Sequence, residues 1–300
     1  MGHEPREEEN PTAMPKFAPK YEELQSIYDI SNEFFELFLG PTMGYTCGYY
    51  EGNDTTRDEA QNAKFDLALG KLDLQPGATL LDIGCGWGGC MQRAIEKYDI
   101  NVIGLTLSES QREYAIAKLA KVPTTRNVEV RLQGWEEFDG NVDRIVSIGA
   151  FEHFSRERYP AFFEMAYNAL PEDGRMLLHT ITTISGSEDA QSRGIPLTLE
   201  LARFVLFIMK EIFPGRQLPS AWMPREYATA AGFTVTRADE IGPHYVRTLQ
   251  DWAAALAAHS DEAIVLQSED VYHRYDKYLN GCVRLFRQGY TSVHQYTLQK

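Results

Sequence analysis

The sequence contains no long hydrophobic run. Across its 300 residues, no apolar stretch approaches the ~20 residues that a helix needs to cross a bilayer. The opening residues, MGHEPREEENPTAMPK, also lack the apolar core of a secretion signal. We therefore expect a cytoplasmic protein without a transmembrane segment.

Positive charge is also scarce. The chain has 29 Lys and Arg residues against 43 Asp and Glu residues, which gives a formal net charge of −14 at pH 7. Nucleic acids and anionic membranes attract proteins that carry a positive field. The charge balance argues against both as partners, so an acidic partner would have to bind a local basic patch.

Cysteine is rare as well. The four cysteines, Cys47, Cys85, Cys90 and Cys282, are spaced too widely for a zinc knuckle. They are also too few for a disulfide framework in a chain of this size. We expect reduced thiols and no metal site.

Glycine, in contrast, is concentrated in one segment, LLDIGCGWGG at residues 80–89. An apolar run that breaks into glycines predicts a strand, a tight turn and a helix, with Gly84, Gly86 and Gly88 letting a ligand approach the main chain. The same letters also fit the dinucleotide pattern G-x-G-x-x-G, and an ordinary strand-to-helix turn is a further alternative. Asp82 would repel a pyrophosphate, whereas it suits a ligand with an ammonium and a sulfonium, such as S-adenosylmethionine (SAM).

Strand and helix patterns alternate after this segment, which predicts an α/β fold with a parallel sheet covered on both faces. The expected strands are 78–83, 101–106, 127–132, 142–148, 174–182, 233–239 and 291–298. The expected helices are 88–98, 108–120, 156–169, 223–231, 245–258 and 269–288. In such a sheet, ligands bind beyond the carboxyl ends of the strands.

The remaining segments predict a leader, a cap and a lid. Residues 1–20 are charged and contain proline, so we expect a disordered leader without chemistry before a single domain at 21–300. Residues 21–75 predict an N-terminal helical cap, with Ser31 as the N-cap of an aromatic helix. Residues 183–222 predict a helical lid, in which 197–209 is apolar nearly all round. Such a helix is either buried on most sides or lines an apolar cavity.

Polar residues follow the predicted strands at the expected ligand edge. Thr106 and Gln111 stand where many nucleoside-binding proteins place an acid, and both can hydrogen-bond a ribose diol. Trp135 offers a flat face for a purine and Glu136 an acceptor for its amine, although Trp135 alone is as consistent with the core.

Two further groups follow later strands. Glu152 stands between aromatic residues at a strand end, which makes it a candidate site carboxylate. Its neighbour His153 is also consistent with a helix surface. His179 lies on an apolar strand and is either a core residue or, because it is near the strand end, part of the site.

With these motifs, the chain resembles the cyclopropane-fatty-acid-synthase-like methyltransferases, and within them the mycolic acid cyclopropane synthases of mycobacteria. The resemblance extends from about residue 24 to 300. The motifs that carry it are YDISNEFFELF, YTCGYY, LLDIGCGWGG, GWEEF, DRIVSIGAFEHF, LLHTI, EIFPG, PHYVRTL and YLNGCVRLFR. It implies a class I SAM-dependent methyltransferase fold, Rossmann-like, with a seven-stranded and mostly parallel sheet and helical additions over the site.

The resemblance also implies the roles of individual residues. It puts the methionine end of SAM against Tyr45, Thr46, Gly84 and Gly86, the ribose near Thr106 and Gln111, and the adenine between Leu107 and Trp135 with Glu136 at its edge. It implies a bicarbonate ion held by Cys47, the backbone of Ile148, Glu152, His179 and Tyr245. Cys282 matches a cysteine regarded as an active-site residue in the family.

The implied reaction is methyl transfer from SAM to a cis double bond in a long, meromycolyl-type acyl chain on an acyl carrier protein. Loss of a proton to bicarbonate then closes a cyclopropane ring. Aromatic faces can stabilise the intermediate carbocation. The candidates are Tyr28, Phe151, Phe154, Phe204, Phe207 and Tyr245. Relatives that form hydroxylated products tend to carry an acid where this chain has Gly149, so Gly149 favours the ring.

Basic residues on the final predicted helix form a possible docking patch for the carrier, although a solvated helix face is the simpler explanation. They are Arg274, Lys277, Arg284 and Arg287.

Rival functions are a methyltransferase that acts on another unsaturated lipid or on a small amine, one that gives a hydroxylated or methyl-branched lipid, and a binding module without catalysis. A nicotinamide dehydrogenase is disfavoured by Asp82 and by the missing ribose acid.

Overall fold

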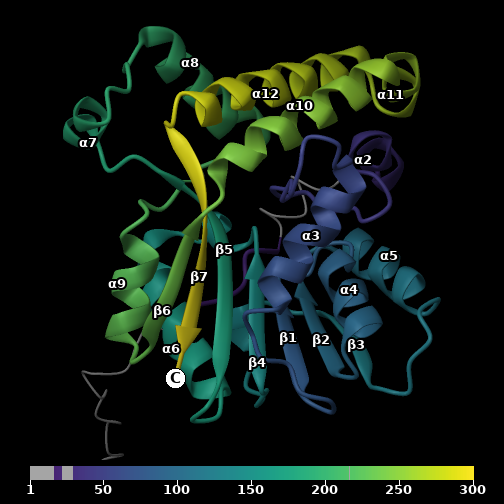
Figure 1. The fold of residues 1–300 in the computed structure, drawn as a ribbon. Coiled ribbons are helices and arrows are strands. Elements are labelled where there is room, and N and C mark those ends of the chain that lie inside the picture. Colours follow the sequence, from purple (N-terminus) through teal and green to yellow (C-terminus); the bar gives the residue numbers. More distant parts are fainter. Residues whose placement is uncertain (1–16, 22–29, 216) are drawn as a thin grey trace, which may run out of the picture.

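The central element of the protein is a seven-stranded sheet with the strand order β3-β2-β1-β4-β5-β7-β6 (Figure 1). The structure is a computed structural model that describes residues 17–21, 30–215 and 217–300. The strands are β1 (Thr79–Ile83), β2 (Asn101–Thr106), β3 (Val128–Leu132), β4 (Arg144–Ile148), β5 (Arg175–Thr183), β6 (Thr234–Glu240) and β7 (Thr291–Gln299). Each predicted strand is present within two residues of its expected bounds.

The sheet is mostly parallel, as predicted. β1 pairs in parallel with β2 and with β4, and β7 is antiparallel to both of its neighbours, β5 and β6. The strand order reverses between β1 and β4, which opens a crevice at their carboxyl ends. The glycine-rich turn follows β1, and Gly149 follows β4, so both border this crevice.

Helices cover both faces of the sheet. α3 (Arg57–Leu69), α4 (Gly89–Lys97) and α5 (Glu109–Leu119) bury one side, where Phe65, Met91 and Ala115 meet alternate strand residues such as Leu80. α6 (Tyr159–Ala169) and α9 (Met223–Ala230) bury the other side against residues such as Leu81. Successive strand residues point to opposite faces, so the apolar run of β1 supplies both cores.

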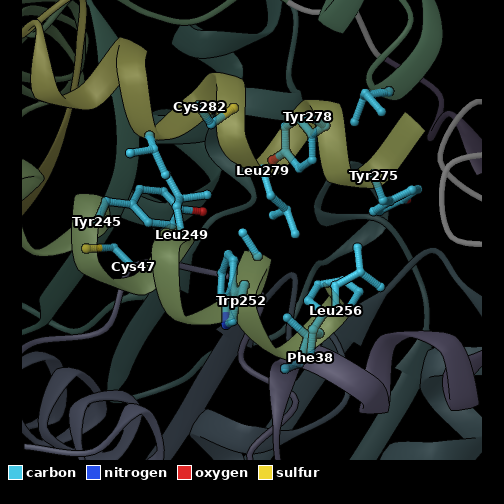
Figure 2. Packing of buried hydrophobic residues seen from close by; sticks show 14 of the residues in the cluster. Phe38, Cys47, Tyr245, Leu249, Trp252, Leu256, Tyr275, Tyr278, Leu279 and Cys282 are labelled. Carbon is cyan, nitrogen blue, oxygen red and sulfur yellow. The ribbon is translucent and has the colours of Figure 1, made fainter. Parts of the chain in front are cut away.

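A third helical layer crosses the carboxyl ends of the parallel strands (Figure 1). It consists of α2 (Asn32–Leu39), α8 (Leu199–Phe207), α10 (Gly242–Ala258), α11 (Ser260–Leu266) and α12 (Glu269–Arg287). Figure 2 shows Phe38, Trp252, Leu256 and Tyr275 packed between α2, α10 and α12. Ser31 caps α2 by accepting a hydrogen bond from the backbone of Phe34, as its sequence predicts.

Two predictions about the helices are incomplete. The structure adds the short helices α7 (Ser187–Ser192) and α11, which the sequence pattern did not reveal. The predicted helix at 197–209 divides into α8 and a π-helical segment, η4 (Ile208–Ile212). Leu199 is 78% exposed and Leu206 is 63% exposed, so α8 is not buried on most sides. Its inward face instead lines a cavity that is described below.

The predicted disordered leader is also wrong at its end. Residues 1–16 lie outside the described residues, but Phe17 packs beneath the guanidinium of Arg158, 4.9 Å from its ring centroid. The backbone oxygen of Ala18 accepts a hydrogen bond from the same guanidinium. Residues 17–20 therefore form part of the folded domain.

Within the described part of the chain, no helix is long and apolar enough to span a bilayer. The four cysteines are all buried and unpaired with one another, as expected. The described residues also contain no cluster of His, Cys, Asp and Glu that could hold a metal ion.

Candidate active site

A first cavity lies where the strand order reverses, at the carboxyl ends of β1, β2 and β4. It encloses about 1210 Å³, including its opening. The predicted cofactor residues line it together, and they are Tyr45, Thr46, Asp82, Gly84, Gly86, Thr106, Leu107, Gln111, Trp135, Glu136 and Ile148. Segments that are far apart in the sequence thus form one continuous space.

The glycine turn has the conformation that its residues predict. Gly84 and Gly86 both have positive φ angles, +79° and +53°. A Cβ on Gly84 would overlap that of Ala150, whereas the space above Gly86 is open. Gly88 also has a positive φ angle, +79°, as predicted, but it does not line the cavity. A Cβ at Gly88 would lie 3.1 Å from the Cβ of Ala115 on α5. Gly88 therefore serves helix packing and not ligand approach, contrary to the sequence prediction.

Asp82 is the acid of this cavity and is 2% exposed. Burial raises its pKa to about 7, and the nearby Lys64 partly opposes this shift. Its Oδ2 atom is buried and accepts no hydrogen bond from any described residue. A cationic group of a ligand beside this oxygen would stabilise the charged form of Asp82. Lys64, on α3, also lines the cavity, and sequence analysis did not single it out.

The other half of the cavity combines polar and aromatic groups. The Thr106 hydroxyl donates to Oε1 of Gln111 at 3.0 Å. Trp135 is held by the rings of Phe154 and Phe162 at centroid distances of 5.6 and 5.4 Å. Next to it, one oxygen of Glu136 pairs with Arg158, and Oε2 accepts no hydrogen bond from the described residues. This oxygen is free to accept a hydrogen bond from a ligand.

A second cavity of about 1410 Å³, including its opening, meets the first. Tyr45, Thr46, Gly149 and His153 line both cavities and thus mark the junction. The walls of the second cavity are mainly apolar. They include Ile181, Val205, Ile208, Met209, Phe213, Leu218, Leu249, Leu285 and Phe286. This is the cavity that the inward face of α8 and η4 covers.

A polar group of residues lines the second cavity as well, and it includes Cys47, Glu152, His179 and Tyr245. Glu152 accepts hydrogen bonds from Oγ1 of Thr180 at 2.9 Å and from the backbone of Ile181 at 3.4 Å. Burial raises the pKa of Glu152 to about 7 and holds the pKa of His179 well below its usual range. His179 is therefore a neutral imidazole at pH 7, and Glu152 is poised between its two protonation states.

The thiols and the phenol at this site are protonated. Burial raises the pKa values of Cys47, Cys282 and Tyr245 far above their usual ranges. The Cys47 thiol donates to the backbone oxygen of Gly48 at 3.2 Å. Cys282 also lines the second cavity, but a buried thiol of this kind is a poor nucleophile.

Some predicted residues lie elsewhere. Ile148 lines the first cavity and not the second, so it is separated from the other residues expected around bicarbonate. Phe151 stacks on Tyr159 in the core below the sheet, 4.2 Å between ring centroids, and lines neither cavity. Phe204 and Phe207 pack against α12 instead.

The aromatic set around the second cavity therefore differs from the predicted one. Of the six aromatic candidates, Tyr245 lines the second cavity, Phe154 lines the first, and Tyr28 lies outside the described residues. Sequence analysis missed the remaining aromatic residues of the second cavity, which are Phe213, Tyr278, Phe286 and Tyr290. Tyr278 and Phe286 lie on α12, whereas Phe213 follows η4 and Tyr290 precedes β7, so no single local pattern links the four.

The predicted basic patch on α12 is partly engaged within the protein. Lys277 lies 3.9 Å from the ring centroid of Phe207, Arg284 pairs with Glu200 at 3.0 Å, and Arg274 approaches Glu211 at 3.9 Å. These contacts join α12 to α8 and η4. The side chains of Arg284 and Glu200 stay exposed, as does Arg287, so the patch lies on the surface and is partly engaged with α8 and η4.

The sequence profile of the family "Mycolic acid cyclopropane synthetase" matches residues 16–296. This chain belongs to that family. A relative from Mycobacterium tuberculosis, S-adenosylmethionine-dependent methyltransferase UmaA, is 59% identical over 287 residues, which cover 96% of this chain and all of UmaA. Cyclopropane mycolic acid synthase 1 from the same species is 56% identical, over 94% of this chain and 98% of that protein.

Solved structures of the cyclopropane synthase family share the fold. Cyclopropane synthase MmaA2 from Mycobacterium tuberculosis superposes with a TM-score of 0.93 at 54% identity, over 95% of this chain and 100% of that chain. Mycolic acid cyclopropane synthase CmaA1, complexed with SAH and CTAB, gives 0.92 at 55% identity over the same shares. The protein is therefore a methyltransferase with the class I SAM-dependent fold, as the motifs predicted.

Proposed function

We propose that this cyclopropane synthase family member transfers a methyl group from SAM to a cis double bond of a long acyl chain and closes a cyclopropane ring. The observation that carries the proposal is the junction of two unlike cavities at Tyr45, Thr46, Gly149 and His153. One cavity holds buried polar groups that lack partners, and the other is a mainly apolar space. A methyl donor bound in the first cavity, with its charged sulfonium at the junction, would face a hydrocarbon chain bound in the second cavity.

The first cavity suits SAM group by group. The unpartnered oxygen of Asp82 can accept hydrogen bonds from the cofactor ammonium, and that of Glu136 can accept one from the adenine amine. Trp135 presents its ring to the cavity for the purine. CmaA1, at 55% identity, was crystallised with SAH, which supports the same ligand here.

The second cavity suits a long alkyl chain. Its walls carry aliphatic and aromatic side chains from four helical elements, and burial of such a chain is favourable by about 0.8 kcal/mol per CH₂ group. CTAB, named with CmaA1, is itself a long alkyl chain with a cationic head. An alkene is a poor nucleophile, and a fixed orientation can contribute ~7–11 kcal/mol in well-aligned cases.

The polar residues of the second cavity fit a bicarbonate ion. Tyr245 and neutral His179 can donate hydrogen bonds to an anion. Glu152 can accept a hydrogen bond from the hydroxyl of bicarbonate when ionised, or donate a hydrogen bond to the ion when protonated. When both are bound, SAM supplies the methyl group that turns the double bond into a carbocation, and bicarbonate accepts the proton whose loss closes the ring. Glu152 adds negative charge near the cation and holds the ion in place.

The chain's own residues then protect the cation. Aromatic faces attract a desolvated cation by about 2 kcal/mol or more each, and Tyr245, Tyr278 and Phe286 line the cavity. Tyr245 and Phe286 are in contact, with ring centroids 4.6 Å apart. Exclusion of water by these rings prevents capture of the cation as an alcohol.

Gly149 supports ring formation over hydroxylation. It has a φ of +74°, and a Cβ there would overlap the methyl group of Thr46 at the junction of the cavities. Gly149 itself offers no side chain that could hold a water molecule beside the cation. The name of UmaA, at 59% identity, states methyl transfer without a product, so hydroxylated and methyl-branched lipids remain the second candidates.

We also propose that the acyl chain is delivered on a carrier protein. Arg156 and Gln217 are the two exposed residues among those that line the second cavity, so they mark its mouth. Arg156 forms no ion pair or side-chain hydrogen bond with any described residue. A cation at the mouth of an apolar cavity suits a chain whose outer end is anionic, as a phosphate-bearing carrier arm is.

Incubation of the purified enzyme with methyl-labelled SAM and a cis-unsaturated acyl carrier tests the proposal. We expect a product that has gained one CH₂ group, with the vinyl protons lost and cyclopropyl protons present in the NMR spectrum. A product with an added hydroxyl group would overturn ring formation and leave methyl transfer intact. Labelling of a small amine, without labelling of any acyl chain, would overturn the lipid substrate.

A further inference from the structure

Lys64 is a fully buried lysine whose function the mechanism above does not explain. Its side chain comes from α3, has no exposed surface and lines the first cavity. The ammonium Nζ lies 3.6 Å from the ring centroid of Phe65 and donates to Oγ1 of Thr46 at 2.8 Å. A lysine is seldom buried unless its charge meets a specific need.

Thr46 is held from three directions. Besides the Lys64 contact, Nε2 of the buried Gln61 donates to the backbone oxygen of Thr46 at 2.7 Å. Gly149 lies so close to the Thr46 methyl group that it leaves no room for a Cβ. Gln61 and Lys64 are three residues apart, on one face of α3. The helix therefore fixes both the backbone and the side chain of a residue that lines both cavities.

The Lys64 contact also determines where the Thr46 proton goes. An ammonium only donates, so the Thr46 oxygen accepts at that side, and its own proton has to be donated elsewhere. No described residue receives that proton in a hydrogen bond. The hydroxyl is thus available as a donor toward a ligand in the cavity.

Lys64 and Asp82 line one cavity without forming a direct ion pair. Burial lowers the pKa of Lys64 to about 7 and raises that of Asp82 to about 7, and a ligand of opposite charge beside each group would favour its charged form. Asp82 lacks a partner for one oxygen, and Lys64 is satisfied on the side of Thr46. A ligand that carries both an ammonium and a carboxylate can complement the two charges together. The amino-acid end of SAM has this zwitterionic form.

We propose that Lys64 is a positioning residue for SAM, which orients the Thr46 hydroxyl toward the cofactor carboxylate while Asp82 receives the cofactor ammonium. The inference concerns cofactor binding and rests only on SAM as the ligand. It is independent of which lipid is modified, so its test can fail while the proposed reaction stands.

The test measures binding by calorimetry, without turnover, for two probes. SAM carries an ammonium, a sulfonium and a carboxylate. Decarboxylated SAM retains the ammonium and the sulfonium but lacks the carboxylate. A hydrogen bond to a charged group contributes enough for the wild type to favour SAM by about 10- to 100-fold. We expect Lys64→Met to reduce this preference to within about threefold, mainly by weakening SAM. Lys118→Met removes another lysine, which caps the backbone of Pro41 and Thr42 outside the cavities, and should leave the preference unchanged.

A second variant keeps the result interpretable if Lys64→Met is unstable. Thr46→Val preserves the shape of the side chain and removes the hydroxyl, so it should lower the preference for SAM by a similar factor. The double variant should then be no worse than either single one, because the two groups act as one unit. Equal weakening of both probes, or unchanged SAM affinity in either single variant, would overturn the proposal.

Discussion

The two cavities are built in different ways. The first is formed largely by short segments that follow β1, β2, β3 and β4, with Tyr45 and Thr46 from the loop after α2 and Lys64 from α3 added to them. The second draws its walls from β5, η4, α10, α12 and the loop after α2. The positions of the polar groups in the first cavity therefore depend mainly on the carboxyl edge of the sheet. The second can change shape through any of several helices without disturbing the cofactor.

Their energetics differ in the same way. The first cavity retains buried charges and unpartnered oxygens, at Asp82, Lys64 and Glu136, which a ligand has to complete. Such groups destabilise the free protein and gain a matched partner on binding. The second cavity offers mainly apolar walls around one polar group of residues. We therefore expect ligand recognition to be electrostatic in the first cavity and hydrophobic in the second, and variants should separate the two.

The largest expected effect is the loss of methyl transfer when Glu152 is substituted. Glu152→Gln removes the negative charge and the acceptor from the second cavity, so we expect methyl transfer to fall by about 10²- to 10³-fold. SAH affinity, measured by calorimetry, should stay within about twofold, because Glu152 does not line the first cavity. The exposed neighbour Glu157→Gln is the control. Nearly normal turnover in Glu152→Gln would show that the polar group of the second cavity is not catalytic.

Asp82 should give the opposite pattern. Asp82→Asn leaves the cofactor ammonium without its charged partner, and SAH affinity should fall by about 30- to 100-fold. Binding of a fluorescent fatty acyl probe to the second cavity should not change. Asp99→Asn alters an exposed carboxylate that pairs with Arg126, and it provides the matched control. If the acyl probe is lost together with SAH, the two cavities do not act separately.

The lid offers a smaller effect, confined to the second cavity. The Phe204 ring of α8 lies directly on Gly281 of α12, where no Cβ fits. Gly281→Ala should therefore displace α8 and raise the KM for the acyl substrate about 10-fold, with SAH affinity unchanged. The double variant Gly281→Ala with Phe204→Leu restores space and should recover most of the loss. Failure of this rescue would mean that the contact does not set the position of the lid.

The smallest effect is on stability and follows from the raised pKa of Glu152. Because its folded-state pKa is about 7 against a usual 4.5, the folded protein binds this proton more tightly than the unfolded chain does. The resulting stability is fully present below pH 4.5 and is lost as the pH rises through 7, by about 3 kcal/mol. Glu152→Gln should lack this loss, so its unfolding free energy relative to wild type should increase from pH 5 to pH 8. If the difference in unfolding free energy between the variant and the wild type did not change with pH, the raised pKa of Glu152 would be contradicted.

Sequence patterns alone predicted the sheet and most of the cofactor cavity. The alternation of strand and helix patterns predicted the strands, and Asp82 with Gly84 and Gly86 indicated the ligand. These features are local, because consecutive residues determine a strand and the turn that follows it. The same locality explains the N-cap at Ser31.

The tertiary structure decided what local patterns cannot encode. Lys64 is an unremarkable polar residue of a helix in the sequence, and only the packing of α3 on the sheet buries it beside Thr46. Periodicity did not distinguish Phe204, which packs on Gly281, from Phe213, which lines the second cavity. A cavity wall consists of side chains brought together from distant elements, and their directions depend on how those elements cross. The sequence therefore determined the cofactor class and the sheet, while the fold determined the acyl cavity, its lid and the buried charges that complete the site.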